Sequence, residues 1–332
     1  MFYHVMEKQK KMTKKKVVVI GGGTGSATML RGLKLIDDIE LTVIVTVADD
    51  GGSTGRLRSR YNLPAMGDIR NVMVAMAEDE GLLKGLMEYR FEKGINLDGQ
   101  LDVSGHNLGN LILVALTHQQ GSLMEAISLA SNILKVKGHI VPSSSQFITL
   151  FARMIDGTIV KGEDMIPKVH NRIKEVYYNQ QVDANPAAVR AILKADYVIL
   201  GIGSLYTSIL PNMIIPQIKE AFNTTKAKRL YYCNAMTQPG ETDEYDMEAH
   251  VQALVDHGIE GLEGVVFADD VVPDSILKTY QETGSVPVVV SAKQHPYPVY
   301  RDFLMSYAKN QARHNPLLVR DSFQKLRKEF ER

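Results

Sequence analysis

Residues 17–33 read VVVIGGGTGSATMLRGL, and this stretch decides the fold class. The β-branched run at 17–20 predicts a short buried strand, and the glycines that follow predict a tight turn. Apolar residues from Met29 to Ile36 then recur at helical spacing, which predicts an amphipathic helix. A strand, a glycine-rich turn and a helix in this order indicate the first unit of a parallel α/β sheet.

The alternation of strand and helix continues along most of the chain. Near-continuous apolar runs predict further strands at 41–48, 196–204, 229–234, 265–269 and 286–290. Helices are expected from Asp68, taken as an N-cap, after residue 110, from Pro211 to Phe222, across 244–257, between 269 and 286, and at the C-terminus. Strands that are apolar on both faces are typical of a parallel sheet covered on both sides. We therefore predict an α/β fold with a Rossmann-like, doubly wound, mainly parallel sheet.

The middle of the chain has a different pattern. The segments FITLFARMI and TIVKGE flank Asp156–Gly157, a dipeptide that favours a type I′ turn, so we predict a β-hairpin here. We take about 139–180 as an inserted, largely antiparallel segment that lies outside the ligand site. The rest of 16–332 is predicted as a single Rossmann-like domain, with a loop between Gly94 and Gly99. Residues 1–15 are expected to be a disordered or overlong N-terminus.

Composition excludes several classes of protein. The 332 residues carry 38 basic and 38 acidic side chains, so the chain lacks the field expected of a nucleic-acid binder. No apolar run approaches the roughly 20 residues of a membrane span. The single cysteine, Cys233, excludes an internal disulfide and is typical of a reducing cytoplasm. We expect a soluble cytoplasmic protein.

Four loops leave predicted strands at the edge where ligands bind in such sheets. They are GGGTGS (21–26), ADDGGSTGR (48–56), GIGSLYTS (201–208) and CNAMTQPGETDEY (233–245), all rich in glycine or small polar residues. Bare amides at a helix N-terminus suit an anionic phosphate. The last loop offers both donors and acceptors, which suits a nucleobase or a sugar. The sequence therefore predicts a nucleotide site at this edge.

Two adjacent carboxylates in the second loop leave alternatives open. Asp49 follows Gly25 by 24 residues, where a dinucleotide enzyme places its ribose-binding acid. Asp50 beside it could hold Mg²⁺ together with a phosphate, or the pair could cap the amides of the loop. His106 is a phosphate donor, a general acid or a capping group. No catalytic residue is assigned, and Asp50 is the one candidate metal ligand.

The candidate ligand-binding residues come from these loops and from two neighbouring segments. They are Gly22, Gly23, Thr24, Gly25, Asp49, Asp50, Gly51, Gly52, Asp68, Asn71, His106, Asn107, Asn110, Gly203, Ser204, Leu205, Tyr206, Asn234, Thr237, Gln238, Glu241 and Thr242.

A set of segments, taken in order, resembles a known family. The segments are VVVIGGGTG, VTVADDGGSTGRLR, GDIRN, SGHNLGN, GSLYTSILPN and CNAMTQPGETD. They resemble the bacterial gluconeogenesis factor family, often called YvcK-like, over roughly residues 16–315. That family shares a superfamily with 2-phospho-L-lactate transferase. In this sequence Ile202 replaces a common proline, HNLGN stands for HSFGN, and HPYP at 295–298 is a loose match to a downstream His-Asp-Pro.

The resemblance implies a Rossmann-like core in a cytoplasmic protein needed for cell shape and morphogenesis during gluconeogenic growth. It implies binding of uridine-diphosphate (UDP) sugars, with no reaction established for this branch. Partners in cell-wall metabolism and a homo-oligomer are left open. The implied contacts fall on the GGGTG loop, on Asp49 and Asp50, and on the GSLYTS and NAMTQPGET segments. In the transferase branch, the acid after the second strand serves metal and phosphate chemistry.

Three functions remain in competition. The leading one is a regulatory protein that binds a UDP-sugar or another nucleotide diphosphate. The second is a Mg²⁺-dependent transferase of a phosphoryl or nucleotidyl-type group, and the third is an NAD-binding protein. Asp50 favours the second, and the lack of a full Gly-x-Gly-x-x-Gly pattern weakens the third.

Overall fold

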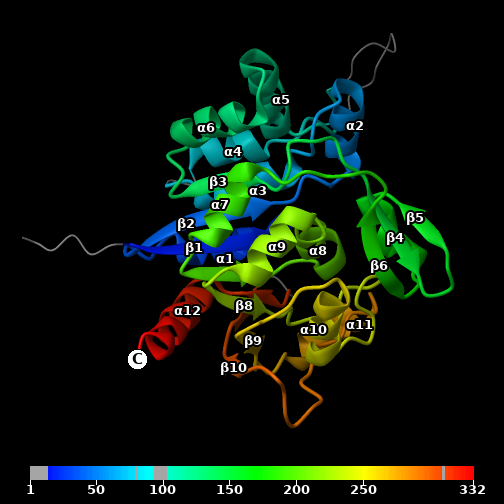
Figure 1. Cartoon of the computed structure of the whole chain (residues 1–332). Coiled ribbons are helices and arrows are strands. Elements are labelled where there is room, and N and C mark those ends of the chain that lie inside the picture. Colours follow the sequence, from blue (N-terminus) through cyan, green and yellow to red (C-terminus); the bar gives the residue numbers. More distant parts are fainter. Residues whose placement is uncertain (1–13, 79–80, 93–102, 309–310) are drawn as a thin grey trace, which may run out of the picture.

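The computed structural model describes residues 14–78, 81–92, 103–308 and 311–332, and its centre is a seven-stranded sheet (Figure 1). The strand order is β10-β9-β8-β7-β1-β2-β3, and each neighbouring pair is parallel. The strands are β1 (Lys15–Gly21), β2 (Ile39–Val45), β3 (His139–Pro142), β7 (Tyr197–Leu200), β8 (Lys228–Tyr232), β9 (Gly264–Ala268) and β10 (Val299–Asp302). The α/β fold with a parallel sheet is therefore confirmed.

The chain builds this sheet outward from its centre in two directions. From β1 it proceeds through β2 to β3 on one side, and from β7 through β8 and β9 to β10 on the other. Because parallel crossovers are right-handed, the helices of the two halves lie on opposite faces. The strand order reverses between β1 and β7, which is the point where open α/β sheets bind ligands.

The helices pack in two groups, and α12, although it ends the chain after the second half, belongs to the group of α1. In the first, α1 packs against α3 and α12, and in the second, α7 packs against α9. The helices are α1 (Gly23–Leu33), α2 (Gly52–Tyr61), α3 (Gly67–Met76), α4 (Leu82–Glu88), α5 (Leu108–Gln120), α6 (Leu123–Ile133), α7 (Pro186–Leu193), α8 (Leu210–Met213), α9 (Pro216–Thr224), α10 (Met247–Asp256), α11 (Asp274–Gln281) and α12 (Pro316–Phe330).

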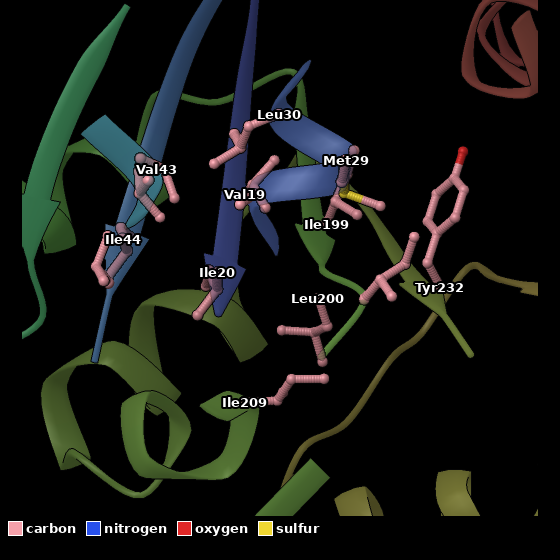
Figure 2. Close-up of a cluster of buried hydrophobic side chains, with 14 of the residues drawn as sticks. Val19, Ile20, Met29, Leu30, Val43, Ile44, Ile199, Leu200, Ile209 and Tyr232 are labelled. Atoms are coloured by element: carbon pink, nitrogen blue, oxygen red, sulfur yellow. The ribbon is translucent and has the colours of Figure 1, made fainter. Parts of the chain in front are cut away.

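The core lies where β1 meets α1 and its neighbouring strands. Figure 2 shows Met29 and Leu30 of α1 beside Val19 of β1, and all three are fully buried. Burying one such side chain stabilises the fold by roughly 1.5–3 kcal/mol. The strand end that carries the glycine turn is therefore anchored in the buried core.

The inserted segment forms a separate antiparallel sheet, in the order β5-β4-β6 (Figure 1, right). Its strands are β4 (Leu150–Met154), β5 (Ile159–Lys161) and β6 (Ile173–Tyr178), with a 3-10 turn, η1 (Glu163–Val169), after β5. The predicted start at residue 139 is wrong, because β3 pairs with β2 in the main sheet. The hairpin is present, but the type I′ turn is wrong. A type I′ turn needs positive φ at both central residues, and only Gly157 has it (φ 89°).

Several predicted boundaries also differ. The strand predicted at 286–290 is absent, and only Pro287, which has no N–H to donate, forms an isolated bridge with Met236. The strands predicted at 41–48 and 196–204 end at Val45 and Leu200. Apolar residues continue past these ends because the loops are themselves buried, so hydropathy alone misplaces the boundary.

The helix predicted from Pro211 to Phe222 is broken. A π-helical turn, η2 (Leu205–Ile209), and α8 come first, and Pro216 starts α9 because proline suits the first turn of a helix. Asp68 is not an N-cap, since Met66 holds that position and Asp68 lies in the first turn of α3. Helices α2, α4, α6 and α7, strand β10, and the two-stranded sheet of β11 (Met305–Ser306) and β12 (Arg313–His314) were not predicted.

Parts of two predictions lie outside the described residues. They concern the loop between Gly94 and Gly99 and nearly all of the N-terminal segment. Lys15, which was assigned to that segment, already belongs to β1.

Replacing Gly157 with valine should lower the free energy of unfolding by about 1–2 kcal/mol, the usual cost of a left-handed non-glycine residue. A Cβ at Gly157 would meet no atom within 4 Å, so backbone strain alone should cause the loss. Urea unfolding of the variant measures it. A loss well above 3 kcal/mol would contradict this account of the turn.

Candidate functional site

The loops after β1 and β7 meet at the point where the strand order reverses. An ideal Cβ at Gly25 would lie 2.5 Å from the carbonyl oxygen of Ile202, so only glycine permits this approach. The Ser26 hydroxyl donates to the same carbonyl at 3.3 Å. The two halves of the sheet are therefore in direct backbone contact beside the N-terminus of α1.

A cavity of about 570 Å³ opens at this contact. All four loops singled out in the sequence contribute to its wall. The predicted residues that line it are Gly22, Gly23, Thr24, Gly25, Asp49, Asp68, Asn71, Gly203, Ser204, Asn234, Gln238 and Glu241. The size suits a nucleotide-sized ligand.

The two adjacent aspartates diverge. Asp49 lines the cavity, and its carboxylate accepts the Gly51 amide at 2.9 Å. Asp50 is not in the cavity wall, and its carboxylate accepts the amide of Asp164 in η1 at 3.1 Å. Asp50 thus joins the inserted segment to the second loop, and its role as a metal ligand stays a prediction.

Asp68 lies against the glycine turn. Its carboxylate accepts the Gly23 amide at the N-terminus of α1, and the charge of Arg70 also favours its ionised form. Burial, and then the charge of Asp49, nevertheless raise the pKa of Asp68 to about 7. An acid therefore occupies the helix N-terminus, where anions are favoured.

Two glutamates complete an acidic lining. Burial, followed by the charges of Asp49, Asp68 and Glu241, raises the pKa of Glu163 to about 9. Burial also raises the pKa of Glu241, although hydroxyls of Ser204 and Thr207 donate to it. Among the described residues that line the cavity, four are carboxylic acids and none is lysine or arginine.

The loops after β7 and β8 are held together by one amide side chain. Asn234 accepts the Gly203 amide at 3.3 Å and donates to the Gly203 carbonyl at 2.9 Å. It also donates to Gln238 at 3.3 Å. Asn234 therefore fixes the spacing of these two loops and has little capacity left for a ligand.

A larger cavity, of about 1050 Å³, lies at the opposite edge, where β1, β2 and β3 begin. Its wall includes Lys16, Ile39 and His139 from those three strands. The smaller cavity is the better candidate, because it contains the glycine turn, a helix N-terminus and the carboxyl ends of the strands.

Ten of the predicted residues do not line the smaller cavity. Among the clearest structural roles, Asn107 caps α5, and Thr237 accepts the amide of Val286. His106 contacts the Ser53 hydroxyl at 3.0 Å. The ten are Asp50, Gly51, Gly52, His106, Asn107, Asn110, Leu205, Tyr206, Thr237 and Thr242.

The family profile described as 2-phospho-L-lactate transferase CofD matches residues 17–304. The chain belongs to the CofD family. A protein of Bacillus subtilis named gluconeogenesis factor is 42% identical over 300 residues, covering 89% of this chain and 92% of its own length. The gluconeogenesis factor of Halalkalibacterium halodurans is 44% identical over 282 residues, covering 84% of this chain and 85% of its own.

A solved structure agrees with this assignment to the CofD family. The crystal structure of a UPF0052 family member from Bacillus halodurans superposes with a TM-score of 0.88 at 41% identity. It covers 93% of this chain and 99% of that one. The fold of this CofD-family chain is thus shared along almost its whole length. No helix in the part of the chain that the structure describes could cross a membrane.

Part of the cavity wall of this CofD-family chain lies outside the segments predicted to bind ligand. Glu163 comes from the inserted segment, so this segment, which was predicted to lie outside the ligand site, contributes to the wall of the candidate cavity. The family's His-Asp-Pro pattern was matched to 295–298, but His295 contacts Glu248 at 2.6 Å and does not line the cavity. His314, in His314-Asn315-Pro316, does line it, and that sequence was the signal to use. Further lining residues are Ile202, Thr207, Ser208, Ala235, Met236, Met305 and Ala312.

Proposed function

We propose that this chain is a cytoplasmic regulatory protein that binds a UDP-sugar, or another nucleoside diphosphate, in the cavity between β1 and β7. The observation that carries the proposal is the meeting of the β1–α1 glycine turn with three polar loops at the reversal of strand order. Relatives named gluconeogenesis factor support a role in cells growing on gluconeogenic carbon sources. A role in cell shape, through partners in cell-wall metabolism or a homo-oligomer, belongs to the same proposal.

Each part of such a ligand has a chemically suitable partner. The amides of Thr24 and Gly25 suit phosphate oxygens, because they are at the N-terminus of α1, while the Gly23 amide donates to Asp68. Asp49 suits ribose or sugar hydroxyls, since a carboxylate accepts their hydrogen bonds. Gln238 offers both a donor and an acceptor.

The acidic lining sets a condition on the diphosphate. With four carboxylic acids and no lysine or arginine in the described wall, the ligand must bind with a cation or beside protonated acids. The residues fit Mg²⁺ only in part, because no three His, Cys, Asp or Glu side chains converge as a metal site among the described residues. Asp49 and Asp68 would hold the ion while phosphate and water supply its other oxygens, as is usual for Mg²⁺.

A Mg²⁺-dependent transferase is the second candidate function. The family description supports it, and so does Asp68, because an acid with a pKa of about 7 suits proton transfer at neutral pH. A transferase would cleave the diphosphate and pass the transferred group to an acceptor hydroxyl, so phosphorus NMR of the ligand over time, with a panel of acceptor alcohols present, would detect the cleavage. An unchanged spectrum supports the regulatory role.

A UDP-sugar at a hundredfold excess over its dissociation constant should raise the free energy of unfolding by about 2.7 kcal/mol. Thermal unfolding with a UDP-sugar, GDP and NAD, each with Mg²⁺ or with EDTA, measures this. Asp49→Asn should weaken binding, and Asp50→Asn is the matched control, because only Asp49 faces the cavity. A shift with NAD alone would overturn the proposal in favour of a dinucleotide.

A further inference from the structure

One histidine in the cavity wall serves no evident purpose within the protein. His314 is at the end of β12, close to the start of α12, and only 8% of it is exposed. Its Nε2 atom is buried and has no hydrogen-bond partner among the described residues. A buried polar atom without a partner typically costs 1–3 kcal/mol, so its presence needs a reason.

The protonation state of His314 limits which chemical groups of a ligand its imidazole can bind. Burial lowers the pKa of its imidazole to about 4. The ring is therefore neutral at physiological pH, so it offers phosphate no positive charge. A neutral imidazole instead exchanges single hydrogen bonds with uncharged groups, accepting at one nitrogen and donating at the other.

Three apolar residues share the cavity wall with His314. Met305 pairs with His314 in the β11–β12 sheet, Ala312 lies two residues before it, and Met236 lines the cavity from the loop after β8. The acids Asp49, Asp68 and Glu163 come from other loops, while Glu241 shares the loop of Met236. Apolar side chains with one hydrogen-bonding nitrogen suit a flat heteroaromatic ring, which has apolar faces and a polar edge.

We propose that His314 binds the nucleobase of the nucleotide through one neutral hydrogen bond, with Met236, Met305 and Ala312 against the ring. The inference rests on the proposed function and deepens it, since it assigns a nucleobase-recognition residue to the same site. Uracil can donate from its N3–H to an unprotonated imidazole nitrogen. The C-terminal β11–β12 sheet thereby becomes part of the ligand site.

The test uses His314→Phe, which keeps a planar ring and removes both nitrogens. Because Nε2 has no protein partner, this change should not lower the thermal stability of the ligand-free protein. The affinity for uridine, UDP and a UDP-sugar should each fall about tenfold, the scale of one buried hydrogen bond. The affinity for pyrophosphate should not change. Calorimetric titration of the full chain measures all four.

His250 supplies a matched control. Its Nε2 is also buried without a partner among the described residues, but it lies in α10 and does not line the cavity. His250→Phe should therefore leave every affinity unchanged. His314→Gln, whose amide can still form a hydrogen bond, should recover part of the loss, and it replaces the phenylalanine variant if that one does not fold.

The outcomes separate the two proposals. If the parent binds a UDP-sugar and His314→Phe binds it equally well, the role of His314 is overturned while the proposed function stands. An equal loss for pyrophosphate would show a general disturbance of the site and would also overturn it. A parent that binds no nucleoside diphosphate, neither a uridine compound nor GDP, overturns both.

Discussion

Replacing Gly25 with alanine should lower the free energy of unfolding by about 3 kcal/mol and weaken nucleotide binding at least a hundredfold. The added methyl group would lie 2.5 Å from the Ile202 oxygen and 2.8 Å from its carbonyl carbon. Overpacking of this kind costs typically 1–3 kcal/mol, and here both partners are backbone with little freedom to move. The loops after β1 and β7 must separate, which also moves the amides proposed to hold phosphate. Urea unfolding and calorimetric titration measure the two effects.

Gly85→Ala is the control for Gly25→Ala, because it adds the same methyl group where no neighbouring atom is close. Gly85 lies within α4, and a Cβ there would meet nothing within 4 Å. Alanine is favoured over glycine in helices by about 1 kcal/mol, so Gly85→Ala should be neutral or stabilising. Equal stability changes at Gly25 and Gly85 would contradict the account of the β1–β7 contact.

Replacing Glu163 with glutamine should stabilise the ligand-free protein by about 2–3 kcal/mol at pH 8. The pKa of Glu163 is about 9 in the fold and close to 4.5 when unfolded, so unfolding at neutral pH releases a proton. The contribution of Glu163 to the free energy of unfolding is therefore highest below pH 4.5. It falls by up to about 1.4 kcal/mol per pH unit until pH 9. Glutamine resembles the protonated acid and removes that dependence.

The measurement is urea unfolding of both proteins between pH 5 and pH 9. The difference in the free energy of unfolding between parent and variant should grow as the pH rises. Because Glu163 is only half-buried, this difference should stay below the value that the full pKa shift would give. Glu260→Gln, at an exposed position, should change stability by less than about 0.5 kcal/mol at every pH. A variant of Glu163 that is less stable than the parent at pH 8 would contradict a neutral carboxyl here.

The central part of the fold could be predicted because local sequence carries its signal. The run at 17–20 and the glycine turn after it define β1 and α1 without help from distant residues. Helix α2 could not be found this way, since GGSTGR has poor helix propensity. Arg58 of α2 donates to the carbonyls of Ala48 and Ile148, so distant contacts hold this helix in place.

The residues of the cavity wall also divide into those that local sequence reveals and those that it does not. Residues on the glycine turn and at strand ends were recognisable, because parallel strands bring their carboxyl ends to one edge. Glu163 was not, since it reaches the cavity through the contact of Asp164 with Asp50, far away in sequence. His314 was missed because β11 and β12 have two residues each, too few to show periodicity.

The position of β1 at the centre of the sheet has a consequence for synthesis of the chain. One edge of β1 pairs with β2, about 20 residues later, but the other pairs with β7, about 180 residues later. At roughly 5–20 residues per second, a ribosome needs on the order of 10–40 s to produce that second partner. During this interval β1, whose residues from Val17 onward are apolar and buried in the finished fold, presents unpaired backbone groups along one edge, which is the usual starting point of aggregation. Nascent chains that stop before residue 197 should therefore depend on chaperones to remain in solution, whatever the stability of the finished protein.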